Sequence, residues 1–457
     1  MKFWPTTPTS QHMRCIGVAV LLLTLSAPAL GSPFTMGVSS ALPDAQNAQQ
    51  NPALAGAMEQ TEVMAAPSIS IQNTFLLRYP DSGTIEKPLG IMGDLTSFIP
   101  AFIYKINPRL GVGITEIAPP LKIKQVITGV PIVLLHSTQL IDIEANVTLH
   151  GAFGGVVGYR FSDYLSLGAK FNYRSVLIDA DVVPAGGGEP LAKQHMDVTT
   201  TTLMAGILLE PIPNRLRLGL STIVFGSNTS ATSVESAFVA QQNASDGSGK
   251  STTTAAATFS QFIAGGAFLL SPRRYIAADL DYKATSPTAK EFSMVDFKEK
   301  PIDGYARLDF RMTAEWAISR TTSVVGGFAM ENSSKGAGRR GTDDDPGKSG
   351  FGSGDVIQIY TGQATLLPAQ SFMGGVKLYF LNDPKKEPDT KRKTHPHAQE
   401  KLKPEKEASE KTNPTGWIVG VGLGYRKATL GIDSSGELPG AYEQTRIYLP
   451  LEFTRRF

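Results

Sequence analysis

Apolar and polar side chains alternate along much of this sequence. In LIDIEANVTLHGAF (140–153), apolar residues stand at odd positions from Ile141 to Leu149, and polar residues stand at even positions from Asp142 to His150. A period of two predicts a β-strand with one dry face and one wet face. The dry face is expected to contact either the core of a soluble β-sandwich or lipid.

The spacing of such strands favours lipid. The alternating segments are about 10–16 residues long, and tight turns and long polar loops follow one another between them. This pattern predicts a transmembrane antiparallel β-barrel, with the apolar face toward lipid and the charged face toward the lumen. The tight turns read INPR, FSDY, PIPN, SPRR and ISRT, and the long loops are expected at 180–196, 228–253, 288–303 and 333–364.

We expect about 14 strands, an even number as in bacterial single-chain barrels. An even number places both chain ends on the side of the short turns, which is the periplasmic side. The expected strands are 68–80, 97–106, 109–118, 140–161, 164–179, 197–210, 215–227, 254–270, 274–287, 304–318, 321–332, 365–381, 415–431 and 443–457.

The two ends of the chain indicate export to an outer membrane. Residues 1–32 are expected to be a signal peptide, because Lys2 and Arg14 precede the apolar run IGVAVLLLTLSAPAL and small residues follow it. An N-terminal membrane anchor is the alternative. The last strand ends in YLPLEFTRRF, and its terminal Phe457 resembles the assembly signal of Gram-negative outer-membrane barrels. The barrel assembly machinery is therefore an expected partner.

The charged residues do not indicate an enzyme or a nucleic-acid-binding protein. The net charge is +2 without a basic stripe, and no nucleophile paired with a base is evident, so we expect no catalysis, no cofactor, no metal and no nucleic-acid partner. The charges are better explained as a polar lumen. The expected lumen-lining residues are Asp142, Glu144, His150, Lys170, Arg174, Arg307, Asp309 and Arg311.

The connection at 382–414 differs from the other expected periplasmic turns. It is rich in Lys, Glu and Pro and almost devoid of large apolar residues, so we expect a disordered insert. A solvated linker is one interpretation, and a contact with a periplasmic partner or the cell wall is the other.

The segment before the first strand, at 33–66, does not alternate. It contains QNPALAGA, and an Asn-Pro-Ala tripeptide placed between a signal peptide and a barrel resembles the outer-membrane long-chain fatty acid and aromatic-hydrocarbon transporter family (FadL-like proteins). The resemblance implies that 33–66 is a hatch inside a barrel at 67–457, with Asn51, Pro52 and Ala53 as gating residues. It also implies an inward kink in the third strand, for which Gly111, Gly113 and Pro119 are candidates within YKINPRLGVGITEIAPP.

One expected loop supports a hydrophobic substrate. VITGVPIVLLHS (126–137) is strongly apolar for a loop in water, so it is expected to contact a ligand through Val130, Ile132, Leu134 and Leu135. The alternative is that it only extends two strands above the membrane or packs on neighbouring loops. By resemblance, the protein moves fatty acids or hydrocarbons passively across the outer membrane when the ligand opens the hatch. We expect a monomer in contact with outer-membrane lipid and lipopolysaccharide. A polar-solute channel and a structural or adhesive barrel are the alternatives.

Overall fold

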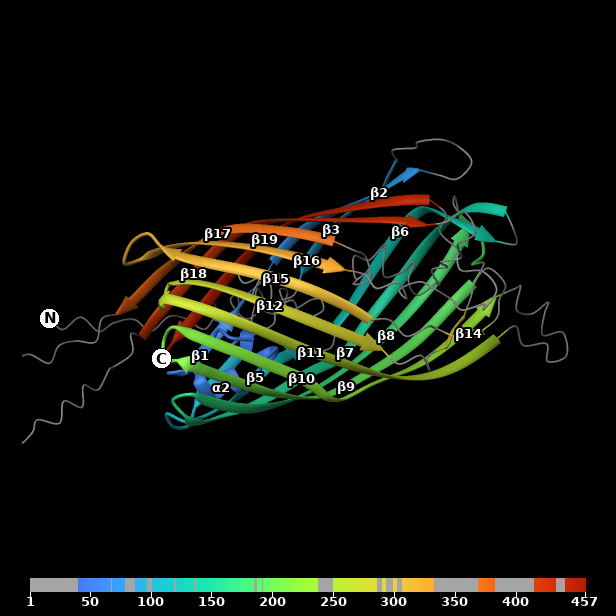
Figure 1. Cartoon of the computed structure of the whole chain (residues 1–457). Helices are drawn as coiled ribbons and strands as arrows, with labels where there is room; N and C mark the ends of the chain where they lie inside the picture. The colour runs from blue at the N-terminus through green and yellow to red at the C-terminus, as the bar shows by residue number, and fades with distance from the viewer. Residues whose placement is uncertain are drawn as a thin grey trace, which may run out of the picture.

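A computed structural model shows a closed antiparallel β-barrel, as the alternation predicts (Figure 1). The structure describes residues 40–66, 68–78, 87–96, 101–118, 121–134, 137–184, 187–190, 192–236, 250–285, 290–292, 299–301, 306–332, 369–382, 415–432 and 440–457. The expected signal peptide, the expected loop at 333–364 and the insert at 383–414 lie outside these residues.

The sheet has 17 strands but 14 positions around the wall, which confirms the expected number. The difference arises because the first six strands share three positions. β1 (Glu62–Ala65) and β2 (Ser68–Arg78) both pair with the last strand. On their other side, β1 pairs with β4 (Ala101–Lys105), and β2 pairs with β3 (Lys87–Thr96). β5 (Leu110–Ala118) and β6 (Leu121–Leu134) both pair with β7.

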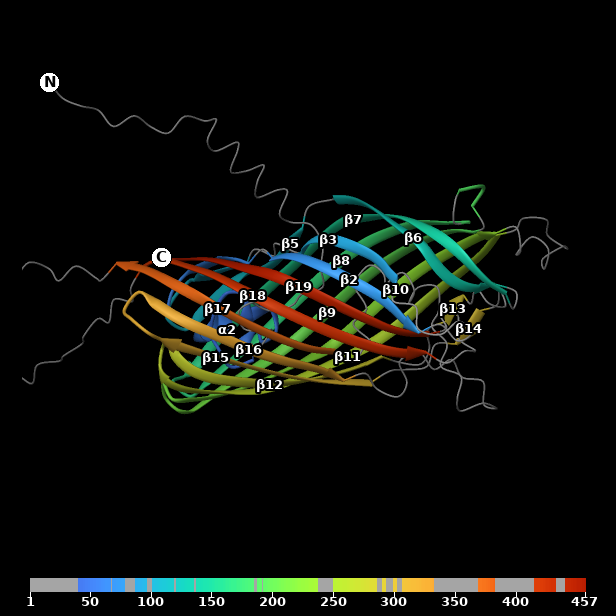
Figure 2. The same ribbon diagram turned by 90° about the horizontal axis from the view of Figure 1, so that it is seen from above.

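The remaining strands each span the wall once, and a short hairpin of β13 and β14 lies apart from the sheet. Figure 2 shows the strands tilted along the barrel, with the short turns gathered at one end. The strands that span the wall are β7 (Ser137–Ser162), β8 (Leu165–Pro184), β9 (Ala192–Ile212), β10 (Leu216–Ser236), β11 (Lys250–Ser271), β12 (Arg274–Thr285), β15 (Ala306–Ala317), β16 (Thr322–Asn332), β17 (Ala369–Asn382), β18 (Thr415–Ile432) and β19 (Gly440–Arg456). The separate hairpin consists of β13 (Lys290–Phe292) and β14 (Glu299–Pro301).

Several strands are longer than the alternation predicts, so part of the loop assignment is wrong. β8 to β11 extend into the expected loops at 180–196 and 228–253. The expected ligand-contacting loop is mostly strand, which agrees with the alternative that it extends two strands, because Val130, Ile132 and Leu134 belong to β6 and pair with β7. Pairing with a neighbouring strand satisfies the backbone N–H and C=O groups of these segments. A polar sequence alone does not reveal that pairing. Leu135 lies outside the described residues.

The two faces of the wall carry opposite chemistry in the part nearest the short turns. On β12, Asp279 is 1% exposed and Leu280 is 47% exposed; on β15, Asp309 is buried and Leu308 is 46% exposed. Apolar side chains therefore point outward, which suits lipid, and charged side chains point into the barrel. The expected orientation is confirmed for these strands.

The orientation reverses in β7 above His150. Leu149 pairs with Val176 and Gly151 pairs with Ser175, so His150 is an extra bulged residue. On the loop side of this bulge, Glu144 pairs with Asp181 of β8, so the two side chains lie on the same face of the sheet. β8 has no register shift against β9, so Asp181 lies on the same face of β8 as Phe171 and Tyr173. Both aromatic side chains are exposed on the outer face.

The lumen-lining assignment of Asp142, Glu144 and His150 is therefore wrong. Asp142 pairs with Val183, two positions along β8 from the partner of Glu144, so both carboxylates lie on the outer face. His150 is exposed at the bulge itself. A single inserted residue shifts the side-chain register by one, which moves every following side chain to the opposite face.

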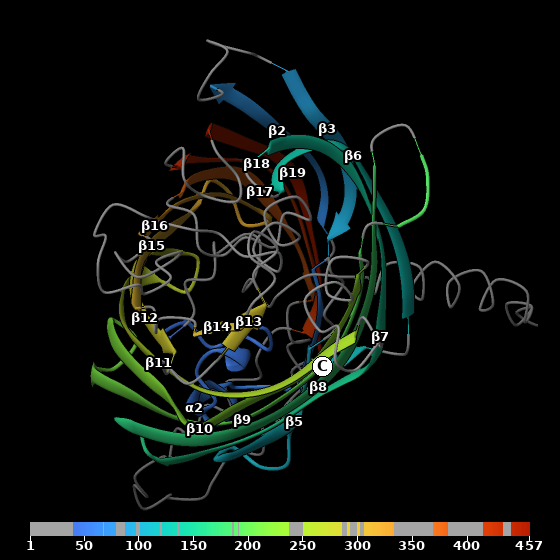
Figure 3. The same cartoon turned by 90° about the vertical axis from the view of Figure 1, so that its right-hand side faces the viewer.

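The described part of the N-terminal segment, from Ser40, contains a short turn of helix η1 (Asn47–Gln49) and the helix α2 (Ala53–Ala57). Viewed along the barrel, α2 lies inside the ring of strands (Figure 3). No helix among the described residues has the length and apolar character needed to cross a membrane. The wall begins with β1, within the range expected for the hatch.

Candidate functional site

The N-terminal segment packs against the inner wall near the short turns. Leu54 and Ala55 of α2 are fully buried, together with Ile103 of β4 and Leu208 of β9. α2 contacts β5, β7, β8 and β9. Burial of these side chains stabilises the docked segment, since each fully buried aliphatic side chain contributes about 1.5–3 kcal/mol.

Glycines in the wall allow this close approach. Gly158, Gly168 and Gly206 are in register across β7, β8 and β9, so they form one row on the wall. A Cβ atom at any of the three would stand less than 3.0 Å from atoms of residues 51–56, a separation that real Cβ atoms do not tolerate. The backbone of the segment therefore rests directly on the backbone of the wall.

Gly111 serves the same purpose, whereas a Cβ at Gly113 would collide with Phe102 and Ile103 of β4. A Cβ at Gly111 would collide with the carbonyl of Ala55, and both glycines pair regularly with β4. The kink assigned to them is wrong, because the irregularities of this wall position are a bulge between Ile114 and Glu116 and the interruption between β5 and β6. Two prolines, 119 and 120, stand in that interruption and lie outside the described residues.

Polar side chains of the wall hold the same segment. Lys170 Nζ donates to the carbonyl of Gln49 at 2.7 Å. Asp279 accepts from the backbone N–H of Ser40 at 3.1 Å and from its hydroxyl. Two expected lumen residues, Lys170 and Arg311, therefore lie inside the barrel, and Arg311 donates to Gln50 Oε1 at 3.4 Å.

Arg174, Asp309 and Arg311 form ion pairs along the inner wall. Asp309 and Arg311 share a cluster with Asp281, whose carboxylate is 3.1 Å from Arg311 Nη2. Arg174 pairs with Glu116. Arg307 is in β15, one of the strands that carry this cluster, and its side chain lies outside the described residues.

Asn51 is fully buried and makes three hydrogen bonds at the turn before α2. Its Oδ1 accepts from the backbone N–H of Ala53 at 3.1 Å, which is the local bond expected at the Pro52 turn. Its Nδ2 donates to the carbonyls of Ser40 at 2.7 Å and of Ile207 in β9 at 3.1 Å. Asn51 thus joins two parts of the segment to the wall, while its gating role, with Pro52 and Ala53, stays a prediction.

Replacing Asn51 by Ala is expected to loosen the segment without disturbing the barrel. A single lost cap would cost about 0.5–2 kcal/mol, but three lost hydrogen bonds raise the expected cost of docking to about 2–4 kcal/mol. Hydrogen–deuterium exchange of residues 40–58 should therefore accelerate, while exchange in β11 and β12 stays as in wild type. Unchanged protection of 40–58 would contradict this prediction.

Asp44 lies where charged residues of three strands converge. It accepts hydrogen bonds from the backbone N–H and the side-chain amide of Asn47, both at 2.6 Å. Burial, reinforced by Glu62 of β1, raises the pKa of Asp44 to about 7, although the side chain keeps some exposed surface. The other charged groups facing it are Lys377 of β17, which lowers that pKa, and Glu452 of β19, which raises it further.

Docking of the segment is expected to weaken as pH rises. A carboxyl whose pKa is raised in the docked state contributes its full stability below its ordinary pKa of 3.8, and the contribution is lost as pH rises through about 7. Exchange protection factors of residues 40–58, which correct for intrinsic exchange, should be higher at pH 5.5 than at pH 8. Asp44→Asn should flatten this dependence, and an equal slope in that variant would contradict the assignment to Asp44.

The inner wall becomes apolar toward the end with long loops. Leu149, Val176 and Val198 are in register across β7, β8 and β9, and Val176 lies on the same face of β8 as Lys170. The three side chains are partly buried. Because the bulge at His150 turns the apolar side of β7 inward, an apolar inner patch lies beyond the charged region of the lumen.

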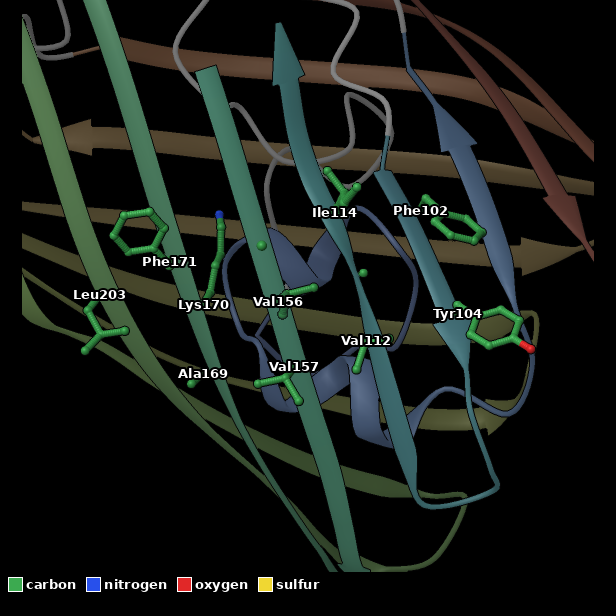
Figure 4. A pocket seen from close by; sticks show the side chains of 12 residues that line it. Phe102, Tyr104, Val112, Ile114, Val156, Val157, Ala169, Lys170, Phe171 and Leu203 are labelled. Atoms are coloured by element: carbon green, nitrogen blue, oxygen red, sulfur yellow. The ribbon is translucent and has the colours of Figure 1, made fainter. Parts of the chain in front are cut away.

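A hollow of about 650 Å³ lies on the outer face of the wall beside the segment. Figure 4 shows Tyr104 of β4, Val157 of β7 and Leu203 of β9 around it, with α2 behind the strands. Its lining is almost entirely apolar, and Lys170, whose amine holds the segment, also contributes to it. At this point the wall therefore carries apolar side chains on its outer face and the docked segment on its inner face.

Solved structures with the same fold provide the comparison. The chain matches a FadL homologue from Pseudomonas aeruginosa with a TM-score of 0.55 and 12% identity, over 95% of this chain and 98% of that one. It matches the toluene transporter TbuX of Ralstonia pickettii with a TM-score of 0.50 and 12% identity, over 94% and 99% of the two chains. It matches the toluene transporter TodX of Pseudomonas putida with a TM-score of 0.50 and 10% identity, over 95% and 99%.

At these identities the matches show a shared fold, and they confirm at that level the resemblance based on the Asn-Pro-Ala tripeptide. No protein-family model and no curated protein matches the sequence.

Proposed function

We propose that this barrel carries hydrophobic small molecules, such as long-chain fatty acids or hydrocarbons, passively across the outer membrane of a Gram-negative bacterium. The observation that supports this most is the N-terminal segment itself, which is buried inside the barrel and held there by wall residues such as Lys170 and Asp279. A segment of the chain docked inside the lumen suits ligand-gated passage better than free diffusion of polar solutes.

Two further observations favour an apolar cargo. The inner wall offers an apolar patch at Leu149, Val176 and Val198 on the side where a ligand would enter. The shared fold with a FadL homologue and two toluene transporters points to the same class of cargo. In this proposal, ligand binds on the apolar patch and shifts the segment, and passage then follows without ATP.

A polar-solute channel is the alternative, since charged residues do line the lumen. Those charges, however, are engaged with one another and with the segment. Arg311, for example, contacts both Asp281 and Gln50. Charges committed to such contacts hold a closed arrangement, so we favour the hydrophobic cargo.

The test compares uptake and conductance. In cells with intact lipopolysaccharide, expression of the protein should raise the uptake rates of radiolabelled oleate or toluene, while entry of arabinose stays at its background rate. In planar bilayers the purified full chain should show little steady current. A steady ion current together with rapid arabinose entry and no gain in oleate or toluene uptake would reject the proposal and favour the polar channel.

A further inference from the structure

Two neighbouring short turns form a hollow that is rich in arginine. The turn between β11 and β12 contributes Arg273 and Arg274, and the turn between β15 and β16 contributes Arg320. β12 pairs with β15 along its length, so these turns are adjacent at the rim of the barrel. The hollow has a volume of about 430 Å³, and its lining includes the three arginines and no carboxylate.

Two of the three guanidinium groups are held in place by neutral partners. Arg273 donates to the carbonyls of Arg320 at 2.7 Å and Ser319 at 3.2 Å, and it stacks 4.6 Å from the ring of Tyr379. Arg274 donates to the carbonyl of Ala317 at 3.4 Å and lies 5.3 Å from the ring of Trp316. Within the described residues none of the three arginines forms an ion pair, so their positive charges are not neutralised there.

The outer face of the wall next to this hollow is strongly apolar. Ile276, Trp316 and Ile318 are 55%, 53% and 66% exposed, and Leu270 on β11 is 61% exposed. Aromatic and aliphatic side chains on the outer face, ending at a cationic rim, mark the level at which a barrel leaves the hydrocarbon and meets the headgroups. The rim with short turns is the expected periplasmic side.

The geometry points to a binding site for the phosphate group of a phospholipid in the periplasmic leaflet, with Arg274 and Arg320 as the phosphate-binding residues. Arg274 lies on the outward side of its strand, above Trp316, and Arg320 is exposed on the adjacent turn. A guanidinium group presents paired N–H donors that match phosphate oxygens. The acyl chains would lie along Trp316 and Ile318.

Arg273 has a different role in this site. Its guanidinium is directed toward Tyr379, a buried residue of the inner face, and its two hydrogen bonds tie one turn to the other. Arg273 is therefore a positioning residue that fixes the distance between the turns. The inference concerns how the rim is anchored in its leaflet, and it is independent of the proposed transport function.

The test measures lipid binding by the full mature chain in a sugar-based detergent. Native mass spectrometry with phosphatidylglycerol and with phosphatidylcholine of identical acyl chains should show tighter binding of phosphatidylglycerol. The double variant Arg274→Gln/Arg320→Gln should lose about twenty-fivefold of that affinity, because each cationic residue at an anionic lipid surface contributes about a factor of five. The gel shift on boiling checks that the variant is a folded barrel.

The matched control is Arg109→Gln/Arg215→Gln, which removes two arginines from other turns of the same rim. It should bind phosphatidylglycerol as wild type does. Equal losses in the two double variants would reduce the effect to overall charge and overturn the site, as would no loss in either. Displacement of phosphatidylglycerol by millimolar inorganic phosphate would also overturn the lipid assignment, because the hollow would then select the free anion.

Discussion

A chain that lacks residues 33–60 is expected to conduct ions steadily in a planar bilayer, whereas the full chain stays closed. Barrels of about 8 strands are filled by their own side chains, and barrels of 16–18 strands enclose an aqueous channel. With 14 positions, this wall is wide enough to need a separate element to close it. Removal of the segment would leave Lys170, Asp279 and Arg311 facing an open, hydrated lumen.

Single-channel recording measures this effect, and the gel shift on boiling verifies assembly. A deletion of the same length in the charged insert, residues 385–412, is the matched control and should leave the protein closed. If the 33–60 deletion assembles and shows no steady current, other parts of the chain close the lumen and the hatch assignment is wrong.

The double variant Gly158→Ala/Gly168→Ala is expected to open the lumen although the amino-acid sequence of the N-terminal segment is unchanged. Alanine fits a β-strand at least as well as glycine, so the wall itself loses no stability. The two new methyl groups would instead occupy the space of Pro52, Ala53 and Gly56. Overpacking of this kind costs about 1–3 kcal/mol for each site, which is comparable to the stability of a short docked segment.

Hydrogen–deuterium exchange should show loss of protection in residues 40–58, and planar bilayers should show a steady current that approaches that of the deletion. Gly326→Ala/Gly374→Ala is the matched control, because a Cβ at Gly374 meets no atom within 4 Å and one at Gly326 meets only ordinary contact distances. A closed, protected Gly158→Ala/Gly168→Ala variant would mean that the segment can move outward and still block the lumen.

The architecture of the wall was predictable because its signal is local. The alternation in segments such as 165–173 and 306–316 depends on neighbouring residues in one strand, and lipid on the outside demands the same apolar face from each strand. Alternation and turn spacing therefore predicted the class of fold and the number of wall positions. They also placed Lys170, Asp309 and Arg311 inside the barrel.

The docking site of the N-terminal segment was only partly predictable. QNPALAGA indicated that Asn51 stabilises a turn, and its hydrogen bond to Ala53 is local. The contacts of Ser40 with Asp279 and of Asn51 with Gly206 join residues that are far apart in the sequence. The glycines at polar-face positions of β7, β8 and β9 could have indicated a close backbone contact. Only the register of the strands, however, shows that these glycines form one row on the wall.

The sequence by itself determined that this chain forms a wide β-barrel preceded by a small-residue segment, because periodicity and turn chemistry act within a few residues. Only the tertiary structure decided which way the alternating stretch at 141–149 faces. The pairing of Leu149 with Val176 and of Gly151 with Ser175 makes His150 a bulge and places Asp142 and Glu144 outside. Register is a relation between two strands, so no pattern within one strand can specify it.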